Sequence, residues 1–360
     1  MRMALGLARR GLGSVWPNPA VGCVLVDGQG RVAGRGWTQP GGRPHAESEA
    51  LRRAGARAGG ATAYVSLEPC SHRGKTAPCA ERLAQAGIAR AVLAIEDPDA
   101  RVSGKGIARL KEAGVEVVSG VCAEEAAAVN AGFFSRVTKG RPLITLKVAT
   151  TLDGRIATHG GESRWITGDV ARSWAHALRA SHDAVMVGLG TAAADDPRLT
   201  CRLPGLEDRS PVRVVIDGRL RLPLTSHLVS GAGEVPTWIV TLGGGKAARR
   251  AAYRERGVEL IEVAADESGN PDPGHALRAL GERGLTRLLV EGGGRLAAAL
   301  LRARLVDRLA WFRSPGIIGG DGVAVAAAFG VDKLADLAAF TRVSVMEAGD
   351  DLLETYALRD

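Results

Sequence analysis

The sequence contains few aromatic residues, few cysteines and no long apolar run, and each absence excludes a class of protein. Phe, Trp and Tyr make up 4% of the 360 residues, so aliphatic side chains must form the cores. The five cysteines are sparse and odd in number, which argues against a disulfide framework. No apolar stretch reaches the roughly 20 residues that cross a bilayer, and the start of the chain does not resemble a secretory signal. We therefore expect a cytoplasmic enzyme with no membrane partner, and we expect Cys23, Cys122 and Cys201 to be buried.

The charge balance points to an anionic partner. The formal net charge is +8, which suits either nucleic acid or a small phosphorylated metabolite. Arg residues are scattered rather than gathered into a tail or stripe, and this favours the small anion. A nucleic-acid deaminase with a basic binding domain is the alternative, but it would need a basic aromatic patch that this aromatic-poor chain lacks. We expect no nucleic-acid partner.

The length predicts two domains rather than one. Hydrophobic residues make up 46% of the chain and charged residues 24%, as in a soluble globular protein. The polar segment Val137–Pro142 contains Gly and Pro and precedes a new apolar strand. We place the boundary there, with one domain at 1–140 and the other at 141–360.

Short β-rich runs alternate with amphipathic helical runs in both halves, which predicts layered α/β domains. The strands predicted in the first half are Val21–Val26, Arg31–Gly36, Ala61–Leu67, Ala91–Ile95 and Val115–Ser119. The helices predicted there are Met3–Arg10, Ala46–Ala56, Ala77–Ala86, Gly106–Ala113 and Ala123–Arg136. The strands predicted in the second half are Leu143–Ala149, Ala184–Val187, Val212–Ile216, Thr237–Val240, Leu288–Val290 and Arg308–Phe312. A hairpin of Thr341–Met346 and Asp351–Leu358 closes the chain.

Four residues in the first half predict a catalytic zinc site. His45, Cys70 and Cys79 supply one imidazole and two thiolates, the three protein ligands that leave a position open for water. Such a metal lowers the pKa of its bound water and generates hydroxide near neutral pH. Glu47 follows His45 by two residues, so it lies close enough to carry protons without binding the metal. The H-x-E and P-C pattern is the one typical of zinc nucleobase deaminases.

Eight residues separate the two cysteines, where nucleobase deaminases usually have two. This insertion contains His72, Arg73 and Lys75, and a cationic loop between metal ligands is well placed to hold a substrate phosphate. Two alternatives remain open. His72 could close the site as a fourth ligand, or the zinc could be purely structural and only the second half active.

The second half contains a strand, three glycines and a helical run at Leu288–Leu300, which suits a phosphate at a helix N-terminus. Gly292, Gly294 and Ala297 satisfy G-x-G-x-x-A, but no second βαβ half follows, so we do not predict a Rossmann domain. Arg179 and Arg202 are candidate phosphate-binding residues. Trp165 could lie against a cofactor ring or fill the core. Lys147 is expected to line the site and Asp153 to occupy a turn.

Together these motifs resemble a known family. The segments Pro17–Val26, Pro44–Glu47 and Thr62–Cys79, with Lys147–Gly168, Gly188–Arg202 and Val214–Gly218, are similar to the bacterial bifunctional deaminase–reductase of riboflavin biosynthesis. The resemblance implies an N-terminal cytidine-deaminase-like α/β/α domain and a C-terminal dihydrofolate-reductase-like α/β domain. It also implies one zinc ion per chain, NADPH, and assembly into a dimer or larger homo-oligomer.

The same resemblance implies an activity and a set of contacts. The first domain would deaminate 2,5-diamino-6-ribosylamino-4(3H)-pyrimidinone 5′-phosphate. The second would reduce the ribosyl group of 5-amino-6-(5-phosphoribosylamino)uracil to ribityl. The implied substrate contacts are Asn18, His72, Lys75, Ser163, Arg179, Leu199, Arg202 and Glu291. The implied NADPH contacts are Ala149, Trp165, Thr191, Asp195, Gly293, Gly294, Arg295, Leu296, Ala297, Ala298 and Ala299. The sequence departs from the family pattern at Thr38, where many relatives carry His, and at Gly218, where some carry Ser.

Overall fold

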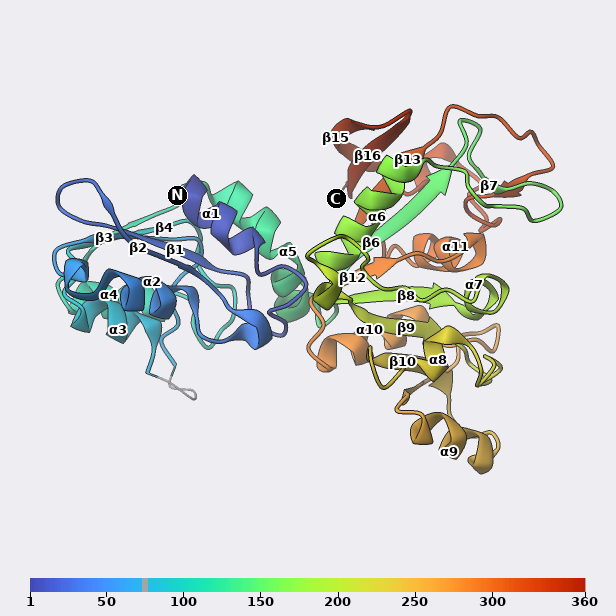
Figure 1. The fold of residues 1–360 in the computed structure, drawn as a ribbon, viewed down its shortest axis with the longest axis horizontal. Helices are drawn as coiled ribbons and strands as arrows, with labels where there is room; N and C mark the ends of the chain where they lie inside the picture. Colours follow the sequence, from blue (N-terminus) through green and yellow to red (C-terminus); the bar gives the residue numbers. More distant parts are fainter. Residues whose placement is uncertain (73–76, 360) are drawn as a thin grey trace. The chain divides into compact units, whose positions relative to one another are not determined.

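The chain forms two compact units, Met1–Gly140 and Arg141–Asp360, in a computed structural model that describes residues 1–72 and 77–359 (Figure 1). The expected polar connection at Val137–Pro142 is half helical. Helix α5 (Ala123–Lys139) continues through it and ends only at Gly140, whose φ of +68° and N–H to the Arg136 carbonyl terminate the helix. The helix therefore extends three residues beyond the predicted end at Arg136.

Five strands form the sheet of the first unit, in the order β2-β1-β3-β4-β5. Strand β1 is antiparallel to β2 and β3, whereas β3, β4 and β5 run parallel. The strands are β1 (Gly22–Val26), β2 (Val32–Trp37), β3 (Thr62–Val65), β4 (Arg90–Leu93) and β5 (Glu116–Ser119). The helices are α1 (Arg2–Arg9), α2 (Ala46–Ala54), α3 (Cys79–Gln85), α4 (Lys105–Glu112) and α5.

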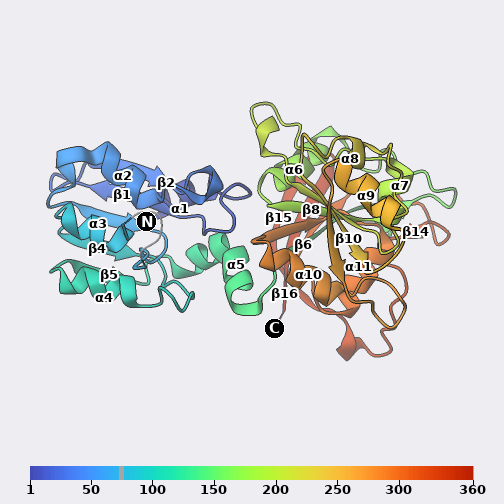
Figure 2. The same cartoon turned by 90° about the horizontal axis from the view of Figure 1, so that it is seen from below.

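Helices cover both faces of this sheet, so the expected α/β/α layering is confirmed (Figures 1 and 2). Cys23 and Leu25 point from β1 into the core beneath α2, α3 and α4, and Val24 points to the opposite face beneath α1. Gly36 in β2 allows α2 to approach closely, because a Cβ there would lie 2.4 Å from the Ala46 carbonyl oxygen. The sequence thus fixes the first turn of α2 directly against the sheet.

The second unit contains a nine-stranded sheet in the order β11-β10-β9-β8-β12-β6-β13-β16-β15. Its strands are parallel from β11 to β13, and β16 and β15 add an antiparallel hairpin. The strands are β6 (Leu143–Thr150), β8 (Ala184–Gly188), β9 (Val212–Ile216), β10 (Thr237–Leu242), β11 (Glu259–Val263), β12 (Arg287–Val290), β13 (Arg308–Arg313), β15 (Phe340–Ala348) and β16 (Asp351–Leu358). Strands β7 (Arg155–Ala157) and β14 (Val323–Ala324) form a separate pair.

Helices lie on both faces of the larger sheet as well. They are α6 (Asp169–Ala180), α7 (Leu189–Asp195), α8 (His227–Ser230), α9 (Ala247–Glu255), α10 (Pro273–Glu282) and α11 (Gly294–Arg302). Residues of α8 and α9 pack into one apolar cluster with β8 and β9, whereas α10 and α11 lie on the other face (Figure 2). The predicted closing hairpin is present, and β7, β11 and β14 were not predicted.

Three smaller expectations can be compared with the structure. Cys23 and Cys201 are buried as expected, but Cys122, the N-cap of α5, is only half-buried. Helix α3 begins at Cys79 rather than at Ala77, since Pro78 is its N-cap. Among the described residues, no helix has the length and apolar character that crossing a membrane requires.

Candidate active sites

Three side chains from separate elements of the first unit converge on one point. His45 precedes α2 as its N-cap, Cys79 is the first residue of α3, and Cys70 lies in the segment that follows β3. The Nδ1 atom of His45 lies 3.7 Å from the Cys70 sulfur and 3.4 Å from the Cys79 sulfur. All three donor atoms lie within 4.8 Å of one another, and no further His, Cys, Asp or Glu of the described residues joins them.

These separations fit zinc. Zn–S bonds of about 2.3 Å and Zn–N bonds of about 2.05 Å at a tetrahedral angle separate sulfur and nitrogen by about 3.5 Å. The Cys79 side chain hydrogen-bonds to Cys70 and, with His45, lowers the pKa of the Cys70 thiol to about 4. The thiolate is the form that binds the metal. Three protein ligands leave one tetrahedral position for water, as in catalytic rather than structural zinc sites.

Glu47 lies beside this cluster in the first turn of α2. It is 4% exposed, and burial raises the pKa of its carboxyl above the ordinary value. A carboxyl whose pKa is raised toward neutrality can both accept and return a proton. The position of Glu47 next to the ligand atoms, outside the ligand set itself, therefore suits acid–base work.

The segment that carries Cys70 is held by Glu68. One Glu68 oxygen accepts the N–H groups of Gly106 and Ile107 at 2.8 and 3.1 Å, at the start of α4. The other accepts those of Asp97 and Gly104 at 3.2 and 3.0 Å. Four backbone donors on one buried carboxylate fix the peptide two residues before the metal ligand.

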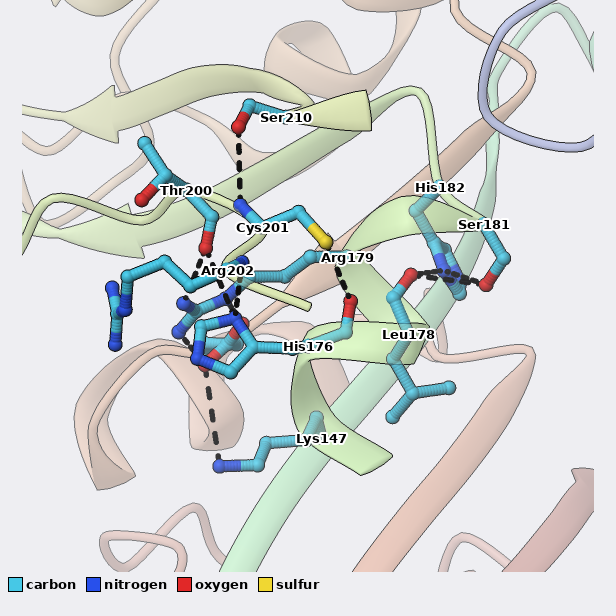
Figure 3. Close-up of polar contacts among 11 residues, drawn as sticks. Lys147, His176, Leu178, Arg179, Ser181, His182, Thr200, Cys201, Arg202 and Ser210 are labelled. Carbon is cyan, nitrogen blue, oxygen red and sulfur yellow. Dashed lines mark hydrogen bonds and ion pairs between the residues drawn. The ribbon is translucent and has the colours of Figure 1, made fainter. Parts of the chain in front are cut away.

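A second group of charged side chains lies in the other unit. Glu291, directly after β12, makes a two-pronged ion pair with Arg179 of α6, with N–O distances of 2.6 and 2.9 Å. The Lys147 amine on β6 lies 4.0 Å from the same carboxylate. All three side chains are less than one-fifth exposed. Figure 3 shows Lys147, Arg179 and Arg202 gathered in this region.

Both groups of residues fall within known family models. The model of the cytidine and deoxycytidylate deaminase zinc-binding region matches residues 1–95, and that of the RibD C-terminal domain matches residues 142–353. The riboflavin biosynthesis protein RibD of Aquifex aeolicus is 39% identical to this chain, over 98% of this chain and 96% of its own. The Escherichia coli RibD has the same identity over the same shares. The chain belongs to the RibD family.

Solved structures agree with this assignment over the full length. Acinetobacter baumannii RibD is 36% identical, with a TM-score of 0.88 over 100% of this chain and 98% of its own. A deaminase/reductase from Thermotoga maritima is 34% identical, with a TM-score of 0.86 over 100% and 97%. The expected fold class is thereby confirmed, and the chain is a bifunctional deaminase and reductase of riboflavin biosynthesis. This membership decides against a purely structural zinc.

The family resemblance implies substrate contacts at Asn18, His72 and Lys75 in the first unit. Asn18 lies against Gly42, three residues before the ligand His45. His72 is exposed and does not belong to the ligand cluster, so its role as a fourth ligand is not supported among the described residues. Lys75 lies outside the residues that the structure describes.

The predicted cofactor residues gather around the start of α11. The Gly293 N–H donates to the Thr191 hydroxyl at 3.1 Å, which joins α11 to α7. Arg295 is exposed in the first turn, whereas the side chains of Ala297 and Ala298 are buried in the core. Backbone groups and the Arg295 guanidinium are thus the parts of this loop that can face an anion.

The remaining predicted cofactor residues lie at strand and helix ends. Asp195 ends α7, and its carbonyl accepts from Arg164 at 3.2 Å. Ala149 is half-buried on β6. Trp165 is 69% exposed and lies against the Arg172 guanidinium, which overturns the alternative that it fills the core.

The predicted substrate residues Ser163 and Leu199 differ in exposure. Ser163 is exposed in the segment before α6. Leu199 is 3% exposed and has a φ of +53°, a conformation that a branched-chain residue adopts only when the surroundings impose it. The Leu199 side chain belongs to the buried apolar cluster of this unit. Asp153 occupies the predicted turn, where Thr151 and Gly319 hydrogen-bond to it.

Sequence reasoning missed His176. Its ring lies on α6 one turn before Arg179, with Nδ1 3.1 Å from the Thr200 carbonyl and 3.3 Å from the Arg202 N–H (Figure 3). Burial and the cations Arg179 and Arg202 lower its pKa to about 4, so it is neutral at pH 7. His176 thus joins α6 to the segment that carries Arg202. The spacing of three residues from Arg179 on one helix is the signal that could have shown it.

The ion pair between Glu291 and Arg179 should make the stability of the fold depend on pH below about pH 4.5. Burial alone would raise the pKa of Glu291, but Arg179 and Lys147 outweigh it and lower the pKa from 4.5 to about 2. Because the pKa of Glu291 is lower in the folded than in the unfolded protein, the ionised carboxylate stabilises the fold at pH values above 4.5. This stabilisation is lost as the pH falls from about 4.5 toward 2. We expect the stability gap between the wild type and Glu291→Gln to narrow by about 1 kcal/mol between pH 6 and 3.5. Urea unfolding at both pH values measures it, and a gap that stays constant contradicts the assignment.

Proposed function

We propose that residues 1–140 deaminate 2,5-diamino-6-ribosylamino-4(3H)-pyrimidinone 5′-phosphate and that residues 141–360 then reduce the ribosyl group of the product with NADPH. The Thermotoga maritima relative is a diaminohydroxyphosphoribosylaminopyrimidine deaminase and 5-amino-6-(5-phosphoribosylamino)uracil reductase, which supports this pair of substrates. The observation that carries the first step is the three-ligand cluster with the buried Glu47 beside it.

Deamination replaces the amino group of the pyrimidine by an oxygen from water. When zinc is bound, it lowers the pKa of its water so that hydroxide is available near neutral pH. Glu47 would accept a proton from the attacking water and return it to the departing nitrogen, so that ammonia leaves as the C–N bond breaks. His45, Cys70 and Cys79 would hold the metal, and Asn18 would contact the pyrimidine.

In the reductase step, the phosphate of the substrate would bind among the cations Arg179, Arg198 and Arg202. Burial, and then the neighbouring cations Arg179 and Arg198, lower the pKa of the Arg202 guanidinium. Arg179 is already held by Glu291, so Arg202 is the group best able to form a two-pronged contact with phosphate. Ser163 and Leu199 complete the proposed substrate contacts.

NADPH fits the loop that follows Glu291. Gly292–Gly294 come directly after Glu291, so a cofactor phosphate held at the start of α11 would lie next to Glu291, whose carboxylate is a proposed contact of the substrate. The helix N-terminus and the exposed Arg295 suit that phosphate. NADPH supplies the hydride that converts ribosyl to ribityl, and the protein supplies the alignment of the two reactants.

Chelation of zinc should separate the two activities. We expect a chelator to abolish ammonia release from the diaminopyrimidine substrate, while NADPH oxidation with the uracil substrate continues, because the metal ligands all lie in residues 1–140. Added Zn²⁺ should restore ammonia release. The measurement is a pair of parallel assays on one preparation, and loss of both activities would contradict the division.

A further inference from the structure

The loop that carries Asn18 is anchored from both sides by buried side chains. We define the Asn18 loop as Pro17–Val21. The Ala20 N–H donates to Oδ1 of Asn130 on α5 at 3.0 Å. The Val21 N–H donates to the Thr38 hydroxyl oxygen at 3.0 Å. Thr38 and Asn130 are each 2% exposed, so water does not compete for these bonds.

Thr38 binds the loop twice. Its hydroxyl accepts from Val21 and donates to the Pro19 carbonyl at 3.2 Å. A hydroxyl carries one hydrogen, and this bond uses it inside the protein. Thr38 therefore acts on the peptide that follows Asn18 and has no proton to donate to a substrate.

Gly42 limits the position of the Asn18 side chain. It lies in the short turn Pro40–Gly42, whose flanking residues Gln39 and Pro44 are joined by a 3.0 Å hydrogen bond directly before His45. A Cβ on Gly42 would lie 1.8 Å from Nδ2 of Asn18 and 2.7 Å from its Cγ. The Asn18 amide is thus in close contact with the turn that leads into the zinc ligand.

We infer that Thr38 and Gly42 are positioning residues of the deaminase, which hold the Asn18 amide at a fixed position relative to the metal ligand His45. The inference rests on the proposed function, in which Asn18 contacts the pyrimidine. Thr38 fixes the backbone on one side of Asn18, and Gly42 leaves the space into which its amide fits. A displacement of the amide by about 1 Å costs about a hundredfold in rate when the reacting geometry depends on it.

The role of the Thr38 hydroxyl is tested by a pair of variants, one without the hydroxyl and one with it. Thr38→Val removes the hydroxyl at nearly constant volume, and Thr38→Ser keeps it. We expect Thr38→Val to lower kcat/KM for ammonia release by about ten- to a hundredfold and Thr38→Ser to remain close to wild type. NADPH oxidation with the uracil substrate, measured on the same full-length proteins, should not change. An equal loss in both variants would overturn the role of the hydroxyl.

The contact at Gly42 has a matched control in the adjacent residue. Gly41 and Gly42 have φ values of +73° and +81°, so Ala is strained to a similar degree at both. A Cβ on Gly41, however, meets no atom within 4 Å. We expect Gly42→Ala to lower kcat/KM for ammonia release by about a hundredfold, with the zinc content retained, and Gly41→Ala to have little effect. Equal losses in the two variants would overturn the proposal.

Combination with Asn18→Ala shows whether Gly42 acts through Asn18. If it does, Gly42→Ala should cost little more in the Asn18→Ala background than Asn18→Ala alone, because the displaced amide is already gone. Additive losses would overturn the inference. A wild-type protein with bound zinc that releases no ammonia would instead refute the proposed substrate, which separates the two failures.

Discussion

Glu47→Gln is expected to lower the rate of deamination by about a thousandfold or more, because the amide can neither take a proton from the attacking water nor return it to the leaving amine. The buried carboxyl lies beside the metal ligands, and no water can replace it easily at 4% exposure. Gln has nearly the same volume, so the site should keep its zinc. Ammonia release and zinc content, measured on the same preparation, check the prediction.

Glu49 provides the matched control for this variant. It lies two residues further along the same helix, and its side chain is 11% exposed and paired with Arg52 at 2.9 Å. Glu49→Gln should therefore cost at most about 1 kcal/mol of stability and leave ammonia release intact. NADPH oxidation should persist in both variants. A zinc-loaded Glu47→Gln protein that deaminates at the wild-type rate would refute the acid–base role.

The main features of the first unit could be predicted from the sequence because they are carried by residue type and short spacing. His45 and Glu47 stand at the start of a helix, and Cys79 opens another, so local rules bring each near the correct end of its element. The strands of that sheet were predicted because they alternate with helices at regular spacing. Strand β11 (Glu259–Val263) was missed because its sequence, ELIEV, does not alternate polar and apolar residues regularly.

Contacts between residues distant in the sequence could not be predicted in this way. Nothing in the sequence shows that Asn130 accepts a hydrogen bond from Ala20, 110 residues earlier. The same is true of Gly42, whose missing side chain matters only because Asn18 lies against it. For the glycines at 292–294, the sequence predicted a role in ligand binding but not their role in packing. We read Gly294 as space for a phosphate, yet a Cβ there would lie 2.8 Å from the Ala324 carbonyl, so the glycine also serves packing.

Glu291→Gln is the second variant with a large expected effect, and it acts on the other unit. Breaking one partner of a buried ion pair leaves the other charge unpaired and costs about 3 kcal/mol or more of stability. Arg179 would lose its two-pronged partner, and Lys147 would lose the carboxylate 4.0 Å away. We expect kcat/KM for NADPH oxidation to fall by about a hundred- to a thousandfold, as when other preorganised polar groups are removed from active sites. Ammonia release should not change.

A loss of stability alone could also lower NADPH oxidation, and a second buried ion pair separates the two effects. Arg141 and Asp307 are 12% and 11% exposed, close to the 13% and 10% of Arg179 and Glu291, and their N–O distance is 2.6 Å. Asp307→Asn should destabilise the same unit by a similar amount while the folded fraction still oxidises NADPH. If Asp307→Asn and Glu291→Gln reduced turnover equally per folded molecule, Glu291 would be a structural residue only. If only Glu291→Gln does so, its carboxylate acts on the reactants, and the pair with Arg179 holds it in place for that task.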